Sequence, residues 1–383
     1  MKLTSLCADP GIRLDQVKGA TIHLTALWRA LGLEGAAVTG IAACGNGAPV
    51  APEPGVTVLP IPFDGADLPS RVLAAAFTAV ERGAAPDAVL ERLALDSDAG
   101  LVLARRLRVP LVVEINAPLD EEARRFRGRE PTPEMLERQR RLLEGADLVY
   151  VVSDALAEYA WARGARRGRV RVLPNGVDTA SFVGPRMRRE DGAPVRVGFV
   201  GAFRPWHGLE LLVDACACAR AQGAPIELEL IGDGPLREPL ERRVAARGLA
   251  AHVRFLGARP HADVPGFLLG VDVAVVAAPE DVDYYFSPLK LYEYAAAGCA
   301  IVAPRAGQVE ARFRHGEDAL LVPPGNTSAL AEGIVALAAD APLRVRLGDA
   351  ARARARAEFD WRIVARTILD WIPELRAVGA EKR

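Results

Sequence analysis

The residues best suited to chemistry lie together at the start of one predicted helix in the second half of the chain. Ser287 is a good N-cap residue, and Pro288 suits the first helical position because it has no N–H to leave unpaired. The amides of Leu289 and Lys290 are then free to face an anion, and the Lys290 side chain adds a formal charge. Glu293 follows on a neighbouring part of the helix surface, where its carboxylate could bind hydroxyl groups. A diphosphate next to a ribose is such a ligand, although an ordinary buried helix fits the stretch equally well.

A second group of candidate residues lies in the loop 201–208, which follows a predicted strand and precedes a predicted helix. Gly201 opens this loop. Arg204 and His207 would project toward the carboxyl edge of the sheet, where a guanidinium can grip phosphate oxygens in a fork and an imidazole can add a donor. The alternative is that His207 only begins the helix and that Trp206 covers the core.

Two features of the first half are also placed to touch a ligand. Residues 2–8 are typical of a buried strand, and a polar loop then leads through Lys18 to Gly19, where a helix begins. Such a loop delivers backbone amides to the carboxyl ends of the strands, where open α/β sheets bind their ligands. Asn116 directly follows another predicted strand, 111–115, and could face the same edge. A plain connection between strand and helix explains the glycine equally well.

Other chemistries find less support in the sequence. Gly232 and Gly234 begin a dinucleotide fingerprint, but Arg237 stands at the third glycine position, so we do not expect nicotinamide binding. Two Asp-x-Asp matches, 96–98 and 281–283, could hold a divalent ion that bridges a diphosphate, although such matches are common in a chain with 49 acidic residues. No His-Glu-x-x-His, Walker A or Gly-x-Ser-x-Gly pattern occurs, which argues against zinc chemistry and serine hydrolysis.

The composition excludes several classes of protein. A chain of 383 residues with a net charge of −1 suits two α/β domains and has no overall attraction to nucleic acid. The 5 cysteines have neither disulfide-framework nor zinc spacing, which indicates a reducing, cytoplasmic setting. We find no run of about 18 apolar residues and no signal peptide, so we expect a soluble or at most peripheral protein. Five arginines without an acid within residues 160–173 leave a peripheral membrane contact open.

Strand and helix patterns alternate along both halves, which predicts parallel sheets covered on both faces. We expect a first domain at residues 1–180, a linker at 181–194, a second domain at 195–358 and a C-terminal helix at 359–383 that crosses back to the first domain. The predicted strands of the first half are 2–8, 37–44, 56–61, 111–115, 148–152 and 170–173. Those of the second half are 195–200, 226–231, 253–256, 271–277, 300–303 and 319–322.

Several of these motifs, in this order and spacing, resemble glycosyltransferase family 4. The resemblance to the nucleotide-sugar domain of that family is strongest at residues 287–302 and extends to 201–208, 231–235, 253–257 and 316–325. In the first half, Lys18-Gly19-Ala20 resembles the glycine loop of the family, and Pro-Asn-Gly-Val-Asp at 174–178 resembles its signature before the linker. The resemblance therefore covers nearly the whole chain.

The resemblance implies the GT-B architecture, in which two Rossmann-like, doubly wound α/β domains face each other. It also implies transfer of a sugar, with retention of configuration, from a UDP-type or GDP-type donor to a hydroxyl of a small-molecule, lipid or glycan acceptor. No metal or other cofactor is then required. A nucleotide-sugar-binding protein without catalytic activity is the alternative. The oligomeric state stays open.

The resemblance also implies roles for individual residues, according to their positions in the family motifs. Glu293 corresponds to the carboxylate that holds ribose hydroxyls, while Lys290 and Arg204 would stabilise the departing diphosphate. Asn116 would face the sugar or the acceptor, and we count it with Lys290 and Arg204 as catalytic. The expected donor-binding residues are Gly19, Gly201, His207, Gly232, Ser287, Leu289 and Glu293.

Three positions depart from the family pattern. Tyr285 stands where the family usually has a glutamate that contacts the transferred sugar, so we expect the contacts to that sugar to be rearranged. His207 stands where a lysine is commonest. Asn116 falls near the place of a histidine in many relatives.

Overall fold

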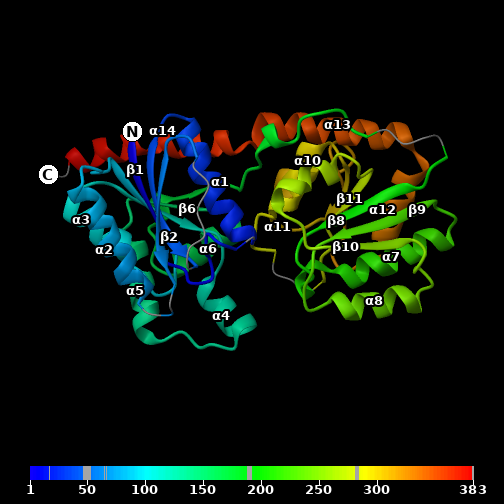
Figure 1. Ribbon diagram of the computed structural model, residues 1–383, viewed down its shortest axis with the longest axis horizontal. Helices are drawn as coiled ribbons and strands as arrows, with labels where there is room; N and C mark the ends of the chain where they lie inside the picture. The colour runs from blue at the N-terminus through cyan, green and yellow to red at the C-terminus, as the bar shows by residue number, and fades with distance from the viewer. Residues whose placement is uncertain are drawn as a thin grey trace. The chain divides into compact units, whose positions relative to one another are not determined.

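The chain forms two compact units in the computed structural model (Figure 1). The structure describes residues 1–16, 18–45, 53–63, 65, 67–187, 192–280 and 284–381. Unit 1 contains Met1–Asn175, Tyr285–Ser287 and Trp361–Arg383, and unit 2 contains Gly176–Tyr284 and Pro288–Asp360.

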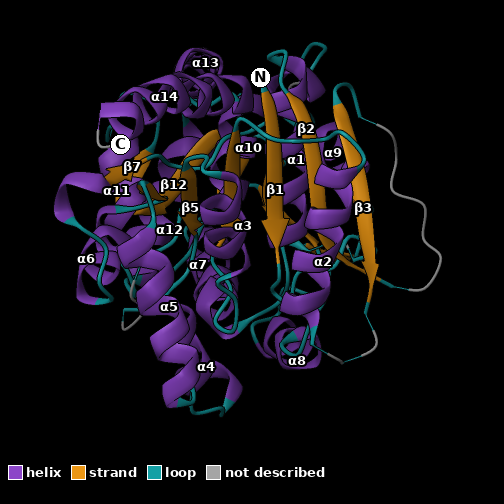
Figure 2. Cartoon of the chain, turned by 90° about the vertical axis from the view of Figure 1, so that its left-hand side faces the viewer, coloured by secondary structure: helices purple, strands orange, loops and turns teal. Residues whose placement is uncertain are grey.

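Unit 1 is built on a parallel sheet of seven strands in the order β3-β2-β1-β4-β5-β6-β7. Figure 2 shows β1, β2 and β3 side by side and pointing the same way. β5 reads Leu-Val-Val-Glu-Ile and is buried along its whole length, as expected for a central parallel strand. The strands are β1 Lys2–Cys7, β2 Ala37–Cys44, β3 Val56–Pro62, β4 Ala88–Arg92, β5 Leu111–Ile115, β6 Leu148–Val151 and β7 Val170–Val172.

The helices of unit 1 cover this sheet, and α1 packs against α14 while α2 packs against α3. Their starts follow local rules, since Thr132 caps α5 through the Met135 amide and Ser153 caps α6 through the Leu156 amide. The helices are α1 Gly19–Leu33, α2 Leu68–Glu81, α3 Ala99–Leu107, α4 Leu119–Arg127, α5 Pro133–Gly145, α6 Asp154–Ala162 and α14 Trp361–Glu381.

The C-terminal helix α14 packs on unit 1, which confirms the prediction that it returns to the first half. Trp361 meets the ring of His23 edge-on with 4.9 Å between the ring centroids. Trp371 lies 6.1 Å from the ring of Tyr150 on β6. An ion pair of 2.5 Å between Arg362 and Glu34 adds a link to the end of α1. The last segment of the chain therefore completes the core of unit 1.

Unit 2 is built on a second parallel sheet, in the order β10-β9-β8-β11-β12-β13. Figure 1 shows α10 and α13 on one side of this sheet and α7 and α8 on the other. The strands are β8 Val195–Val200, β9 Ile226–Ile231, β10 Val253–Gly257, β11 Val273–Val275, β12 Ala300–Pro304 and β13 Leu320–Val322. The helices are α7 Leu209–Ala221, α8 Arg237–Ala246, α9 Val264–Leu268, α10 Leu289–Ala297, α11 Gly307–Arg312, α12 Thr327–Ala339 and α13 Ala341–Glu358.

The two doubly wound sheets confirm the predicted fold class, and each predicted strand is present within a few residues. In the part of the chain that the structure describes, the one strand that the sequence patterns did not reveal is β4, which ends in two charged residues, Glu91 and Arg92. Glu91 is buried because Ser97 Oγ donates to it at 2.8 Å and the Gly100 amide donates at 2.9 Å. These tertiary partners satisfy a charge that would otherwise disfavour a buried strand.

Candidate active site

The candidate site of unit 2 lies where the order of its strands reverses, between β8 and β11. Open α/β sheets bind their ligands at this point, outside the carboxyl ends of the strands. β8 ends at Val200, and Gly201 follows with a φ of 144°, which favours glycine. A Cβ atom on Gly201 would lie 2.8 Å from Nζ of Lys290, so a side chain at position 201 would displace the lysine ammonium from its present place. The structure thus brings two of the predicted site residues together.

Gly232 closes the same region from the end of β9. Its φ is 142°, and a Cβ atom at this position would lie 1.9 Å from the carbonyl oxygen of Gly201. The backbones of the two loops therefore lie so close together that a side chain at position 232 would clash with Gly201. Gly232 shapes the site through this packing of backbones.

Lys290 is the second residue of α10, and its Nζ atom is buried. The ammonium lies 4.3 Å from the centroid of the Phe199 ring and has no hydrogen-bond partner among the described residues. Burial lowers the pKa of Lys290 to about 7, although the nearby charge of Glu293 opposes this effect. A buried donor without a partner is costly, so an anion that reached Nζ would bind strongly.

His207 ends a short 3₁₀ turn, Pro205–His207, and its Nδ1 atom lies 2.6 Å from the carbonyl oxygen of Ala202. Since a carbonyl only accepts, we assign the ring proton to Nδ1. Burial, with a smaller effect of Lys290, lowers the pKa of His207 to about 3, so the ring is neutral at pH 7. Nε2 is then an acceptor. Nε2 can therefore accept a hydrogen bond from a hydroxyl, but it cannot donate one to a phosphate as we expected from the sequence.

Arg204 lies next to this turn and is exposed. Its guanidinium carbon lies 5.8 Å from the ring centroid of Trp206, and it makes no ion pair with any described residue. Its charge helps to lower the pKa of His207, which places it electrostatically within the same site. Arg204 is therefore free to meet a phosphate from solvent.

The start of α10 differs by one residue from the prediction. Pro288 is the N-cap residue and Leu289 is the first helical residue, with no side chain capping the helix. Ser287 Oγ is instead the acceptor for the backbone amide of Asn175, at 3.2 Å. The assignment of Ser287 as N-cap was wrong because a partner far away in the sequence uses its hydroxyl. The first-turn amides of Leu289 and Lys290 consequently have no side-chain acceptor from the cap.

Glu293 pairs with a residue that the sequence did not single out. Its Oε1 atom lies 2.6 Å from Nε2 of His261, and the side chain of Glu293 is only 13% exposed. The hydrogen bond to Glu293 raises the pKa of His261. His261 begins a short 3₁₀ turn, His261–Asp263, four residues after the end of β10. Oε2 of Glu293 makes no hydrogen bond with a described residue and can accept one from a ligand hydroxyl.

In unit 1, Gly19 is the exposed first residue of α1, and Asn116 directly follows β5. Asn116 adjoins a buried ionic cluster that the sequence did not reveal. His23 Nε2 lies 2.5 Å from Glu114 Oε1, and Arg92 lies 3.7 Å from the other carboxylate oxygen. Burial alone would raise the pKa of Glu114, but His23 and Arg92 outweigh it and hold that pKa at about 2.

The Asp-x-Asp match at 96–98 forms ion pairs with arginines. Asp96 accepts from Arg138 at 2.8 Å, and Asp98 accepts from Arg141 at 3.0 Å. The second match, 281–283, lies outside the described residues.

Most arginines of the run 163–171 bind other groups within unit 1. Arg163 binds Asp120 at 2.7 Å, and Arg167 lies 4.3 Å from the ring centroid of Trp161. Arg169 donates to a backbone carbonyl and Arg171 pairs with a residue of α14. Among the described residues, no helix is both long and apolar enough to cross a bilayer.

Two family models match the chain, one in each half. Residues 17–181 match the family described as "Glycosyltransferase Family 4", and residues 194–340 match the family described as "Glycosyl transferases group 1".

Curated relatives point the same way. The chain is 28% identical to a D-inositol 3-phosphate glycosyltransferase of Corynebacterium efficiens over 290 residues, which is 71% of this chain and 67% of the relative. It is 32% identical to a phosphatidyl-myo-inositol mannosyltransferase of Mycobacterium leprae over 207 residues, which is 51% of each protein. The chain thus spans about one half to two thirds of the length of these relatives.

Solved structures share the fold over nearly the full length. Sucrose-phosphate synthase from Thermosynechococcus elongatus has a TM-score of 0.76 at 21% identity and covers 99% of this chain and 100% of its own. HepE of Anabaena in complex with UDP has a TM-score of 0.72 at 22% identity and covers 98% of this chain and 100% of its own.

Proposed function

We propose, since the chain belongs to the group 1 glycosyltransferases of the GT-B fold, that its donor is a nucleoside-diphosphate sugar of the UDP or GDP type. The acceptor is a hydroxyl of a small molecule, a lipid or a glycan. We further propose that transfer retains the configuration of the sugar and requires no metal ion, as the resemblance to family 4 implies.

The observation that carries this proposal is the buried Nζ of Lys290. It has no hydrogen-bond partner among the described residues, and it lies beside Gly201 at the uncapped start of α10. A diphosphate would supply the missing acceptor and would also meet the first-turn amides, toward which the helix dipole attracts negative charge.

The same contacts favour departure of the diphosphate. When the bond between the sugar carbon and the diphosphate oxygen breaks, negative charge builds up on that oxygen. An ammonium and amides that already point at this position stabilise the charge without reorganisation. Arg204 can add a fork of two donors from solvent.

Glu293 and His207 suit the hydroxyl groups of the donor. The free oxygen of Glu293 accepts from a ribose hydroxyl, while His261 holds the other oxygen in place. Nε2 of His207 accepts from a second hydroxyl, which fits its neutral form. Asn116 and Gly19 are proposed to act on the acceptor side and at the diphosphate, respectively.

The test is turnover with a panel of UDP-, GDP- and dTDP-sugars, followed by mass spectrometry of the products. Because the curated relatives are named for inositol-containing acceptors, the acceptor panel includes an inositol phosphate and a phosphatidylinositol in detergent. We expect one donor to give a glycosylated product and the free nucleoside diphosphate, with the anomeric configuration of the donor preserved. Tight binding of a nucleoside diphosphate without any turnover would instead support a binding protein without catalytic activity.

A further inference from the structure

Residues Tyr285–Ser287 belong to unit 1, although unit 2 contains the residues on both sides of them in the chain. We call residues 285–287 the strap. α10, which carries Lys290 and Glu293, begins only two residues after the strap, at Leu289. Three residues of chain span at most about 11 Å, so little slack separates Ser287 from Lys290.

Side chains of unit 1 hold both ends of the strap. Tyr285 Oη donates to Glu122 Oε1 at 2.6 Å, and Ser153 Oγ donates to the carbonyl oxygen of Tyr285. At the other end, Asn175 Nδ2 donates to the carbonyl oxygen of Ser287 at 2.8 Å, and the Asn175 amide donates to Ser287 Oγ. The ring of Tyr285 also packs against the hydrophobic core of unit 1.

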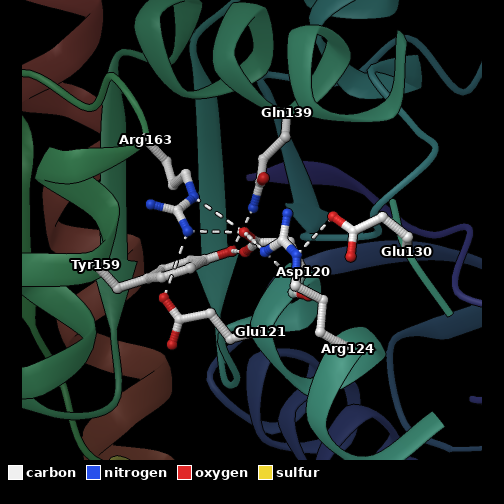
Figure 3. Close-up of polar contacts among 7 residues, drawn as sticks. All are labelled: Asp120, Glu121, Arg124, Glu130, Gln139, Tyr159 and Arg163. Carbon is white, nitrogen blue, oxygen red and sulfur yellow. Dashed lines mark hydrogen bonds and ion pairs between the residues drawn. The ribbon is translucent and has the colours of Figure 1, made fainter. Parts of the chain in front are cut away.

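The elements that hold the strap are themselves fixed. Glu122 lies on α4, and the buried Asp120 on the same helix accepts from Tyr159 at 2.5 Å and from Arg163 at 2.7 Å, both on or directly after α6. Figure 3 shows these side chains converging on Asp120, with Arg124 approaching from α4 itself and Gln139 of α5 reaching Tyr159. Asp120 thus ties α4 to α6, and Gln139 adds a link from α5 through Tyr159, so these contacts hold α4 in place.

Tyr285 therefore has a different role from the glutamate that the family resemblance places there. A side chain whose hydroxyl is bonded to Glu122 and whose ring is packed in unit 1 is committed to holding the strap. The carbonyl groups of Tyr285 and Ser287 are bonded to the same unit, so the backbone is held as well as the side chain.

We propose that Tyr285, Glu122, Ser153 and Asn175 are positioning residues that couple the first turn of α10 to unit 1 through the strap. The proposal rests on the proposed function, since the anion site that they position is the one at Lys290. Strap contacts hold Ser287, Ser287 restrains Pro288 and Leu289, and these fix the direction of the amides and of the Lys290 side chain.

The test uses four single variants of the full chain and the double variant Tyr285→Phe/Glu122→Ala. Tyr285→Phe removes the hydroxyl and keeps the ring, and Glu122→Ala removes its acceptor. Glu122→Gln keeps an acceptor oxygen and serves as the conservative rescue. Glu121→Ala is the matched control, because Glu121 is the next carboxylate on α4, is exposed, and pairs only at 3.4 Å with Arg163 among the described residues.

The first readout is hydrogen exchange of the α10 amides in the ligand-free protein. We expect Tyr285→Phe and Glu122→Ala to speed exchange at residues 291–293 at least threefold, and Glu122→Gln and Glu121→Ala to leave it unchanged. Wild-type exchange in Tyr285→Phe and Glu122→Ala would overturn the proposal. This readout needs no substrate, so it tests the positioning role of the strap even if the proposed function is wrong.

The second readout is steady-state kinetics with the donor found in the panel. We expect kcat to fall about tenfold in Tyr285→Phe and in Glu122→Ala, with a smaller change in KM, and the double variant to be no worse than either single variant. A role in folding alone would lower the folded fraction and leave kcat per folded molecule unchanged, which would contradict the proposal. Absence of nucleotide binding and turnover in the wild type would refute the proposed function but not the positioning role of the strap.

Discussion

Replacing Lys290 with methionine should stabilise the ligand-free protein while it weakens binding of a nucleoside diphosphate. Methionine can follow the lysine side chain as far as Cε, so the change removes little more than the buried ammonium and its donors. In the native protein that ammonium has no hydrogen-bond partner among the described residues, and burial lowers its pKa from 10.5 to about 7. Sites built to bind a ligand often cost stability in this way.

The magnitude follows from the pKa. A fall from 10.5 to about 7 corresponds to a destabilisation on the order of 4 kcal/mol at neutral pH. Because the rest of the side chain is partly exposed and the surroundings relax around a buried charge, we expect roughly half of that, ~2 kcal/mol, as the gain in Lys290→Met.

The sign of the pH dependence is also fixed. Between pH 7 and pH 10 the unfolded chain keeps its lysine proton while the folded chain loses it, so the unfolded state binds more protons and this residue makes stability rise with pH. The rise should be absent in Lys290→Met.

Urea unfolding at pH 7 and at pH 9 measures both effects, and calorimetry with UDP and GDP measures the loss of binding. Lys2→Met is the control, because Lys2 is an exposed lysine whose Nζ lies 3.4 Å from the Gly83 carbonyl oxygen. A Lys290→Met protein that is less stable than wild type at pH 7, or that keeps the same gain between pH 7 and pH 9, would refute the reasoning.

Three further variants test other parts of the account. Glu293→Gln should weaken nucleoside-diphosphate binding about tenfold in calorimetry, since the variant loses a charged acceptor. Thermal unfolding should change little. Unchanged affinity would show that Glu293 does not contact the nucleotide. Gly232→Ala should lower the free energy of unfolding by at least ~2 kcal/mol in urea, because a Cβ would lie 1.9 Å from the Gly201 carbonyl oxygen. Glu114→Gln should cost about 3 kcal/mol at pH 7 by leaving His23 and its neighbours unpaired. The pKa of Glu114 is held at about 2, below its ordinary value, so the stability that Glu114 gives the protein should be present above about pH 4.5 and lost toward pH 2. A difference in the free energy of unfolding between wild type and Glu114→Gln that does not shrink on acidification would contradict this.

Local sequence patterns predicted the fold well because parallel strands and their loops have strong local signals. Continuous apolar runs such as β6 and β12 mark buried strands, and a glycine directly after a strand, as at Gly201, marks the turn at the carboxyl edge. Strand β4 was missed because it ends in two charged residues, which are unusual in a buried strand. One of them, Glu91, is bonded to groups outside the strand. Ser97 and Gly100, which follow it, compensate Glu91 only once the chain has folded.

The candidate site was only partly predictable for the same reason. Lys290 and Gly201 could be proposed from their positions at the start of a helix and the end of a strand. The pairing of Glu293 with His261 joins residues from different elements, and no local pattern announces it. The tautomer of His207 depends on one backbone carbonyl. Ser287 looked like a cap because Ser-Pro usually begins a helix, and only the contact with Asn175 shows otherwise.

The central claim is that a donor diphosphate binds the buried Lys290 ammonium. Calorimetry of an intact UDP-sugar or GDP-sugar at pH 7.5, in buffers of different ionisation enthalpy, measures the protons taken up on binding. An intact nucleotide sugar has no phosphate group that titrates near pH 7, so uptake reports on the protein. With a lysine pKa of about 7, the wild type should take up between about one half and one proton, and Lys290→Met should take up much less. Tight donor binding with equal proton uptake in both proteins would contradict the account.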